Sequence, residues 1–117
     1  MAWLLLLAII VIAILALTLR QTREHAIIAL DDAVAEAHQV NERLGGQILN
    51  LTGTNDTAKQ ALADAAERHY AAAAQLDRAR TPTQAHLARR TALEGLHHIR
   101  TARLSMHMDP GTDLPPL

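Results

Sequence analysis

The residues that could carry chemistry in this chain are seven histidines and the carboxylates near them. Glu94 and His97 stand three residues apart, the spacing that directs a carboxylate and an imidazole from one helix to one metal ion. A di-iron bundle needs two such steps and two further glutamates, and only one step is present. His107 lies between two methionines, soft ligands of the kind that suits Cu(I). Glu94, His97 and His107 are therefore the candidate ligands of a metal-binding or redox subunit.

The alternative interpretation of these residues is plain surface chemistry. Glu94 is also spaced to pair with His97 and His98 on a solvated helix face, and methionine commonly fills gaps in cores. With no cysteine there can be no disulfide and no thiolate zinc site, and the single serine makes serine catalysis improbable. We therefore expect no cofactor, no bound metal and no enzymatic activity.

Charge and aromatic content argue against a nucleic-acid partner. The formal net charge is −1, and Trp3 and Tyr70 are the only aromatic residues of the Phe, Trp and Tyr class. A nucleic-acid binder needs a basic surface and stacking platforms, and this composition supplies neither.

A membrane anchor is predicted at residues 1–19. From Ala2 to Leu19 there are 18 residues without a charge. As a helix they span about 27 Å, close to a hydrocarbon core of about 30 Å. A cleaved signal peptide is the main alternative, but no basic residue precedes the run and no Ala-x-Ala site follows closely. A helix buried in a protein complex is another.

The orientation follows from two basic residues. Arg20 and Arg23 flank the carboxyl end of the apolar run, which places the body in the cytoplasm by the positive-inside rule. We expect a single-pass protein of the cell membrane, with the lipid bilayer as one partner. An exported cell-envelope protein, with its body outside, is the alternative.

Residues 20–108 form an Ala-rich helical body, because Ala, Leu, Gln, Glu and Arg dominate and no strand-period run occurs. A first helix is expected over 20–44, either separate from the anchor or continuous with it, and capped at Gly45. A heptad-like seam, which we predict to be an interaction surface, runs along it at Ile27, Leu30, Val34, Ala37, Asn41 and Leu44. A buried Asn41 would fix register in a coiled coil. An ordinary amphipathic helix with a wet Asn41 near its end is the alternative.

Two further helices are expected. The second spans 57–80, with a capping box at Thr57 and Gln60 or a cap at Asp56. The third begins with Thr81 as N-cap and Pro82 at N1, and ends near Met108. Its arginines could form a basic stripe or a solvated face: Arg89, Arg90, Arg100 and Arg103.

The predicted fold is all-α: an N-terminal transmembrane helix followed by a three-helix bundle or a long helical hairpin. Residues 109–117 form a Pro-containing tail, extended or disordered. Only 21 side chains beyond residue 19 are Leu, Ile, Val, Met or Tyr. Such a small core favours self-association or a protein partner.

The segments ERLGG, LTGTNDTAKQALADAAER, TALEGLHHIRTAR and MDPG, between Glu42 and Gly111, resemble small actinobacterial membrane proteins. These have one N-terminal span and an Ala-rich helical body, and no activity is assigned to them. The resemblance implies that aromatic residues are usual in this family at the positions of His97 and His98. The two histidines would then lie on a face that packs against another helix. Together these observations predict a non-catalytic scaffold or an accessory subunit of a membrane complex.

Overall fold

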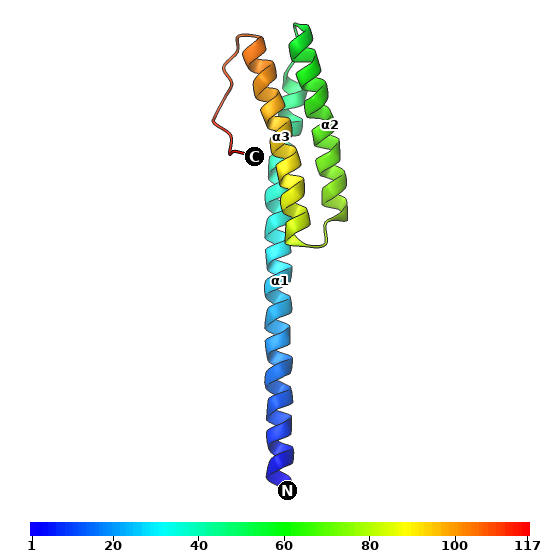
Figure 1. The fold of residues 1–117 in the computed structure, drawn as a ribbon, viewed down its shortest axis with the longest axis vertical. Helices are drawn as coiled ribbons and strands as arrows, with labels where there is room; N and C mark the ends of the chain where they lie inside the picture. Colours follow the sequence, from blue (N-terminus) through cyan, green and yellow to red (C-terminus); the bar gives the residue numbers. More distant parts are fainter.

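Three helices account for the whole architecture, and the predicted all-α class is confirmed. The computed structural model describes residues 1–117. Helix α1 spans Ala2–Asn50, α2 spans Asp56–Arg78 and α3 spans Pro82–Ser105, with no strand. Figure 1 shows α2 and α3 packed beside the C-terminal half of α1, while its N-terminal half stands alone. The molecule is a rod, with extents of 84 × 24 × 19 Å.

Helix α1 is one continuous helix of 49 residues, so the predicted anchor and the predicted first helix of the body are joined. The expected end at Gly45 is wrong, because the helix runs through both glycines to Asn50. A Cβ atom at Gly45 would lie 2.9 Å from His69 Cε1, so this glycine lets α2 approach closely. The extra turn also packs Ile48 against the main core, which offsets a cost of about 1 kcal/mol for a helical glycine.

Helix α2 begins at a cap that the sequence pattern did not identify. Asn55 is the N-cap, and its Oδ1 accepts the N–H of Ala58 at 2.7 Å. The expected caps at Thr57 and Asp56 are therefore wrong. Asn55 Nδ2 also donates to the carbonyl of Ser105 at 3.0 Å. The amide of Asn55 makes both bonds because it carries an acceptor oxygen and a donor nitrogen, whereas an ionised carboxylate could only accept.

The start of α3 is confirmed, and its end is earlier than expected. Thr81 Oγ1 accepts the N–H of Gln84 at 3.2 Å, and Pro82 occupies the first helical turn. The side chain of Gln84 reaches back to accept the N–H of Arg80 at 2.7 Å. The helix ends at Ser105, because His107 adopts a left-handed φ of 58° that turns the chain.

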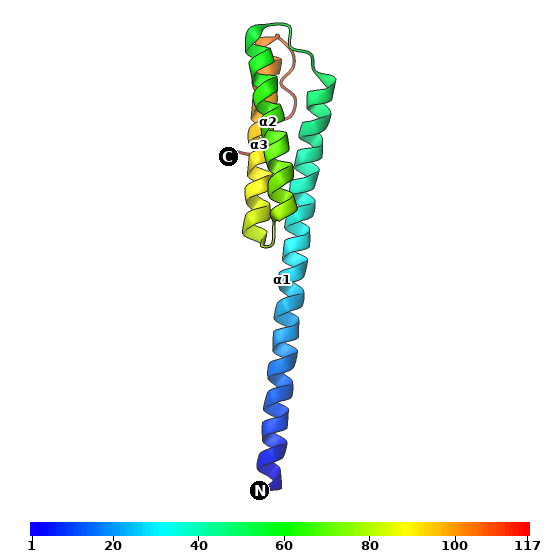
Figure 2. The same ribbon diagram turned by 90° about the vertical axis from the view of Figure 1, so that its right-hand side faces the viewer.

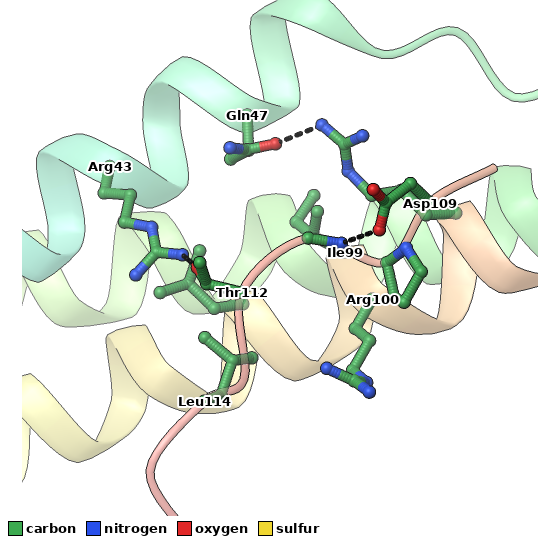
Figure 3. Close-up of a pocket in the computed structure, with 11 residues that line it drawn as sticks. Arg43, Gln47, Ile99, Arg100, Asp109, Thr112 and Leu114 are labelled. Carbon is green, nitrogen blue, oxygen red and sulfur yellow. Dashed lines mark hydrogen bonds between the residues drawn. The ribbon is translucent and has the colours of Figure 1, made fainter.

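The C-terminal tail has no regular secondary structure and lies against α1 and α3 (Figure 3). Arg43 Nη2 donates to Thr112 Oγ1 at 3.1 Å. Leu114 packs against the main core cluster. Beyond it, the carbonyl of Pro115 lies 3.2 Å from His97 Nε2. Polar and apolar contacts therefore both hold the tail to the bundle.

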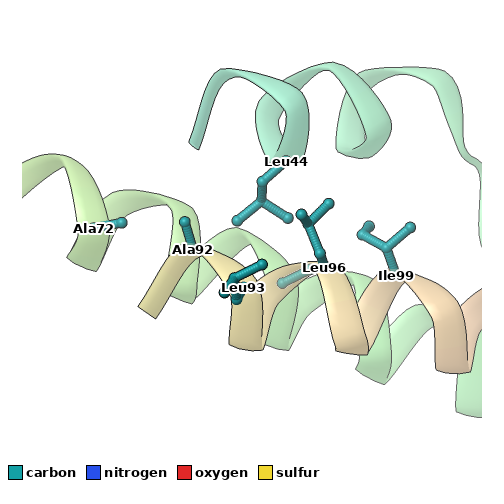
Figure 4. Packing of buried hydrophobic residues seen from close by; sticks show 7 residues of the cluster. Leu44, Ala72, Ala92, Leu93, Leu96 and Ile99 are labelled. Carbon is teal, nitrogen blue, oxygen red and sulfur yellow. The ribbon is translucent and has the colours of Figure 1, made fainter. Parts of the chain in front are cut away.

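The main core is built around a single large side chain, Leu44, which is fully buried (Figure 4). The other buried members of this cluster are alanine, leucine and isoleucine side chains of α2 and α3: Ala65, Ala72, Ala92, Leu93, Leu96 and Ile99. Gly95 makes room for it, since a Cβ there would lie 3.0 Å from Leu44 Cδ1 and closer still to Cδ2. Because small residues face one another, the helices pack closely around few large side chains.

Candidate functional site

The upper half of the predicted seam is used inside the chain. Ala37 and Leu44 are fully buried, and Asn41 is only 6% exposed. Val34 is half-buried and packs against a cluster formed by Ala33 of α1, Ala79 of the α2–α3 connection and Ala85 of α3. These residues contact α2 and α3 of the same chain, so they offer no surface to a partner.

The side chain of Asn41 is buried and hydrogen-bonded rather than solvated. His69 Nδ1 lies 3.0 Å from Asn41 Oδ1, a hydrogen bond that joins α1 to α2. The interpretation of Asn41 as a solvated residue near a helix end is wrong, because α1 continues for nine residues beyond it. A buried polar pair has a preferred partner geometry, so this bond favours one register of α1 against α2.

The lower half of the seam lies in a segment without any covering helix. Residues 20–32, here called the bare segment, contain no buried residue. Figure 2 shows α1 alone from the N-terminus to the level of the α2–α3 connection. That connection meets α1 at Ala33, which clusters with Ala79 and Ala85. The bare segment therefore separates the apolar run from the bundle.

Two isoleucines make the bare segment chemically unusual. Ile27 is 59% exposed and Ile28 is 56% exposed, and Leu30 is half-buried. Eight residues separate Leu19 from Ile27, about 12 Å along a helix, which is beyond the hydrocarbon core if Leu19 marks its edge. Full burial of one such side chain stabilises by roughly 1.5–3 kcal/mol. The bare segment is thus a candidate contact surface.

The candidate metal ligands are not brought together. Glu94 Oε2 pairs with Arg68 Nε at 3.3 Å. His97 faces the tail, and His107 is exposed beyond the end of α3. No group of three or more His, Asp or Glu side chains in the chain is placed to hold a metal ion. The Glu-x-x-His spacing is real, but its carboxylate serves a contact between α2 and α3.

Two of the four arginines of α3 contact α1, so the four do not form one free basic stripe. Arg89 Nε lies 2.9 Å from Glu36 Oε1 on α1. Arg103 Nη2 donates to Gln47 Oε1 at 2.6 Å, also on α1. Arg90 is exposed. Sequence reasoning missed Glu36 and Gln47, because their partners lie more than 50 residues away and no local spacing marks them.

No protein-family model matches the chain, and no curated protein or solved structure matches it. Function must therefore be inferred from the residues themselves. One helix, α1, is long and apolar enough to cross a membrane, and none of its most apolar window is buried in the bundle. A core helix of this chain would be covered by α2 and α3, whereas a membrane segment or a signal sequence would not.

Proposed function

We propose that this chain is a non-catalytic, single-pass membrane protein that acts as a helical scaffold or as an accessory subunit of a membrane complex. The observation that carries the proposal is the division of α1 into three parts. An uncovered apolar run is followed by the bare segment and then by a segment that packs with α2 and α3. The first part supplies location, and the second supplies an exposed contact surface.

The partner side of the proposal rests on Ile27 and Ile28. When a neighbouring helix covers exposed isoleucines, the burial of their side chains stabilises the contact between the two helices. The neighbouring helix belongs to a second copy or to another membrane protein. The helical body that follows the bare segment lies in the cytoplasm. Arg20 and Arg23 support that orientation, because basic residues are retained on the cytoplasmic side.

The contact surface is tested by photo-cross-linking in membranes of cells that express the chain. A photoreactive residue replaces Ile28 in one variant and Leu87 in the control. Leu87 is also exposed, but it lies on α3 of the bundle. We expect a discrete cross-linked product from position 28 and none from position 87. Twice the mass of the chain would identify a second copy. Equal products from both positions, or none from position 28, would contradict the proposal.

Sidedness is tested with a single thiol, because the chain has no cysteine of its own. Thr83→Cys is suitable, since Thr83 is exposed in the first turn of α3. A membrane-impermeant maleimide is added to intact cells and then to lysed cells. Labelling only after lysis is expected for a cytoplasmic body. Labelling of intact cells would favour an exported cell-envelope protein, and a product lacking residues 1–19 would identify a cleaved signal.

A further inference from the structure

A cavity of about 200 Å³ lies between α1, α3 and the C-terminal tail. Figure 3 shows Arg43 and Gln47 reaching into this region from α1, opposite Thr112 and Leu114 of the tail. Leu96 and Ile99 of α3 line it and are almost fully buried. A water molecule occupies about 30 Å³ of liquid, so the cavity has several times the room that one water needs.

The lining of this cavity carries an excess of positive charge. Three arginines line it, namely Arg43, Arg100 and Arg103, against one carboxylate, Asp109. Three positive charges and one negative charge leave a net charge of +2. Asp109 Oδ1 is engaged by the N–H of Gly111 at 2.9 Å. The cavity therefore attracts anions, although Asp109 opposes that attraction.

Two of the arginines have donors to spare. Arg43 donates to the hydroxyl of Thr112 at 3.1 Å, and Arg103 donates to the amide of Gln47 at 2.6 Å. Both partners are neutral, and neither arginine takes part in any of the ion pairs of the chain. A guanidinium has five N–H donors, so most of the donors of both groups have no protein acceptor. Arg100 differs, because it pairs with Asp113 at 3.6 Å.

We propose that this cavity is a binding site for a phosphate group, held by Arg43 from α1 and by Arg103 from α3. A phosphomonoester carries about −1.5 to −2 charges at neutral pH, and Arg43 and Arg103 offer two positive charges that no ion pair of the chain neutralises. The planar fork of each guanidinium suits the paired oxygens of phosphate. Leu96 and Ile99 close the floor of the cavity with apolar side chains, which leaves the arginines as the groups that would bind the phosphate.

The phosphate belongs to a soluble molecule rather than to a lipid, a point that rests on the proposed membrane anchor. Gln47 stands 28 residues beyond Leu19 on the same helix, about 42 Å along its axis. The polar headgroup region adds only about 5–8 Å to each side of the hydrocarbon core. A lipid phosphate therefore lies far below the cavity. The cavity and its arginines are present whether or not α1 spans a membrane.

The test is a titration of the isotopically labelled full-length protein in detergent micelles, followed by NMR. The probes are the backbone amides of Gly111 and Thr112 and the Nε–H groups of the arginines. Inorganic phosphate, glycerol phosphate and succinate are added separately, with sodium chloride keeping the ionic strength constant. We expect saturable shifts with phosphate or its monoester, and weaker binding of succinate. Tighter binding of succinate, or equal shifts with chloride alone, would overturn the proposal.

Variants locate the site. Arg43→Gln and Arg103→Gln are each expected to weaken phosphate binding about tenfold, since each removes a charge-assisted donor. Arg90→Gln is the matched control, because Arg90 is exposed on α3 and does not line the cavity. Arg103→Lys keeps the charge if Arg103→Gln disturbs folding, and it is expected to bind more weakly than the parent. An equal loss in Arg90→Gln would show non-specific attraction and overturn the assignment.

Discussion

Gly95 lies on α3 directly against the fully buried side chain of Leu44. A Cβ atom at this position would also lie 3.1 Å from the Cβ of Arg68, so α1 and α2 both crowd it. Gly95→Ala is expected to lower the free energy of unfolding by about 1–3 kcal/mol, because overpacking forces neighbours to move. Thermal unfolding of the full chain in micelles, followed by circular dichroism, measures this as a lower Tm.

Gly46→Ala is the matched control, since nothing lies within 4 Å of a Cβ atom there. Alanine is the better helix former, so we expect a gain of about 0.5–1 kcal/mol. In a domain of this size, 1 kcal/mol shifts Tm by roughly 4–8 °C, which separates the two variants clearly. A loss of stability in both variants would mean that the effect of Gly95→Ala does not come from the close approach of Leu44 and Arg68.

At the same scale, the sequence allowed some residues of the candidate site to be predicted and hid others. Ala37, Asn41 and Leu44 share a helical spacing with apolar residues, so their common face was visible. Their partners were not visible, because His69 lies 28 residues from Asn41 and no local spacing relates the two. Side-chain pairs between helices, such as the bond between His69 and Asn41, depend on the rotation and register of both helices. Neither quantity is encoded in a local spacing.

At the scale of elements, the N-cap of α2 is Asn55, whereas the local sequence motif predicted Thr57 or Asp56. Asn55→Ala is expected to lower the free energy of unfolding by about 1 kcal/mol or more, since the cap bond and the bond to Ser105 are both lost. Thr57→Ala is expected to change it little, because Thr57 is exposed and no cap bond involves it. Thermal unfolding compares them directly. A larger loss from Thr57→Ala would favour the capping box instead.

The existence of the helices was predictable, and some of their ends were not. Thr81 and Pro82 mark the start of α3 by chemistry that acts within one turn, so the prediction succeeded. Gly45 carries an equally local stop signal, but the packing of His69 against it favours a continued helix. The tertiary contact outweighs the local preference there. The end of α3 was predicted too late, because His107 adopts a left-handed φ of 58° and a histidine does not by itself predict this conformation.

At the scale of the whole molecule, α1 is the only connection between the apolar run and the bundle. The bare segment contains no buried residue, so we expect that its helical state can be disturbed without unfolding the bundle. Ala26→Pro removes a helical hydrogen bond and kinks or breaks a helix, at a local cost of about 3 kcal/mol. We expect the Tm of the bundle to stay within about 2 °C of the parent value, well under the shift for 1 kcal/mol.

Spin labels at Gln21→Cys and Ala35→Cys measure what Ala26→Pro changes. Fourteen residues of continuous helix separate them by about 21 Å along the axis, so the parent should give one narrow distance distribution. Ala26→Pro is expected to broaden that distribution, whereas Ala26→Gln, which retains the backbone N–H, should not. A narrow distribution in the proline variant would mean that an outside contact stiffens the bare segment. A large fall in Tm would mean that the bare segment and the bundle unfold together, and that the division of α1 into independent parts is wrong.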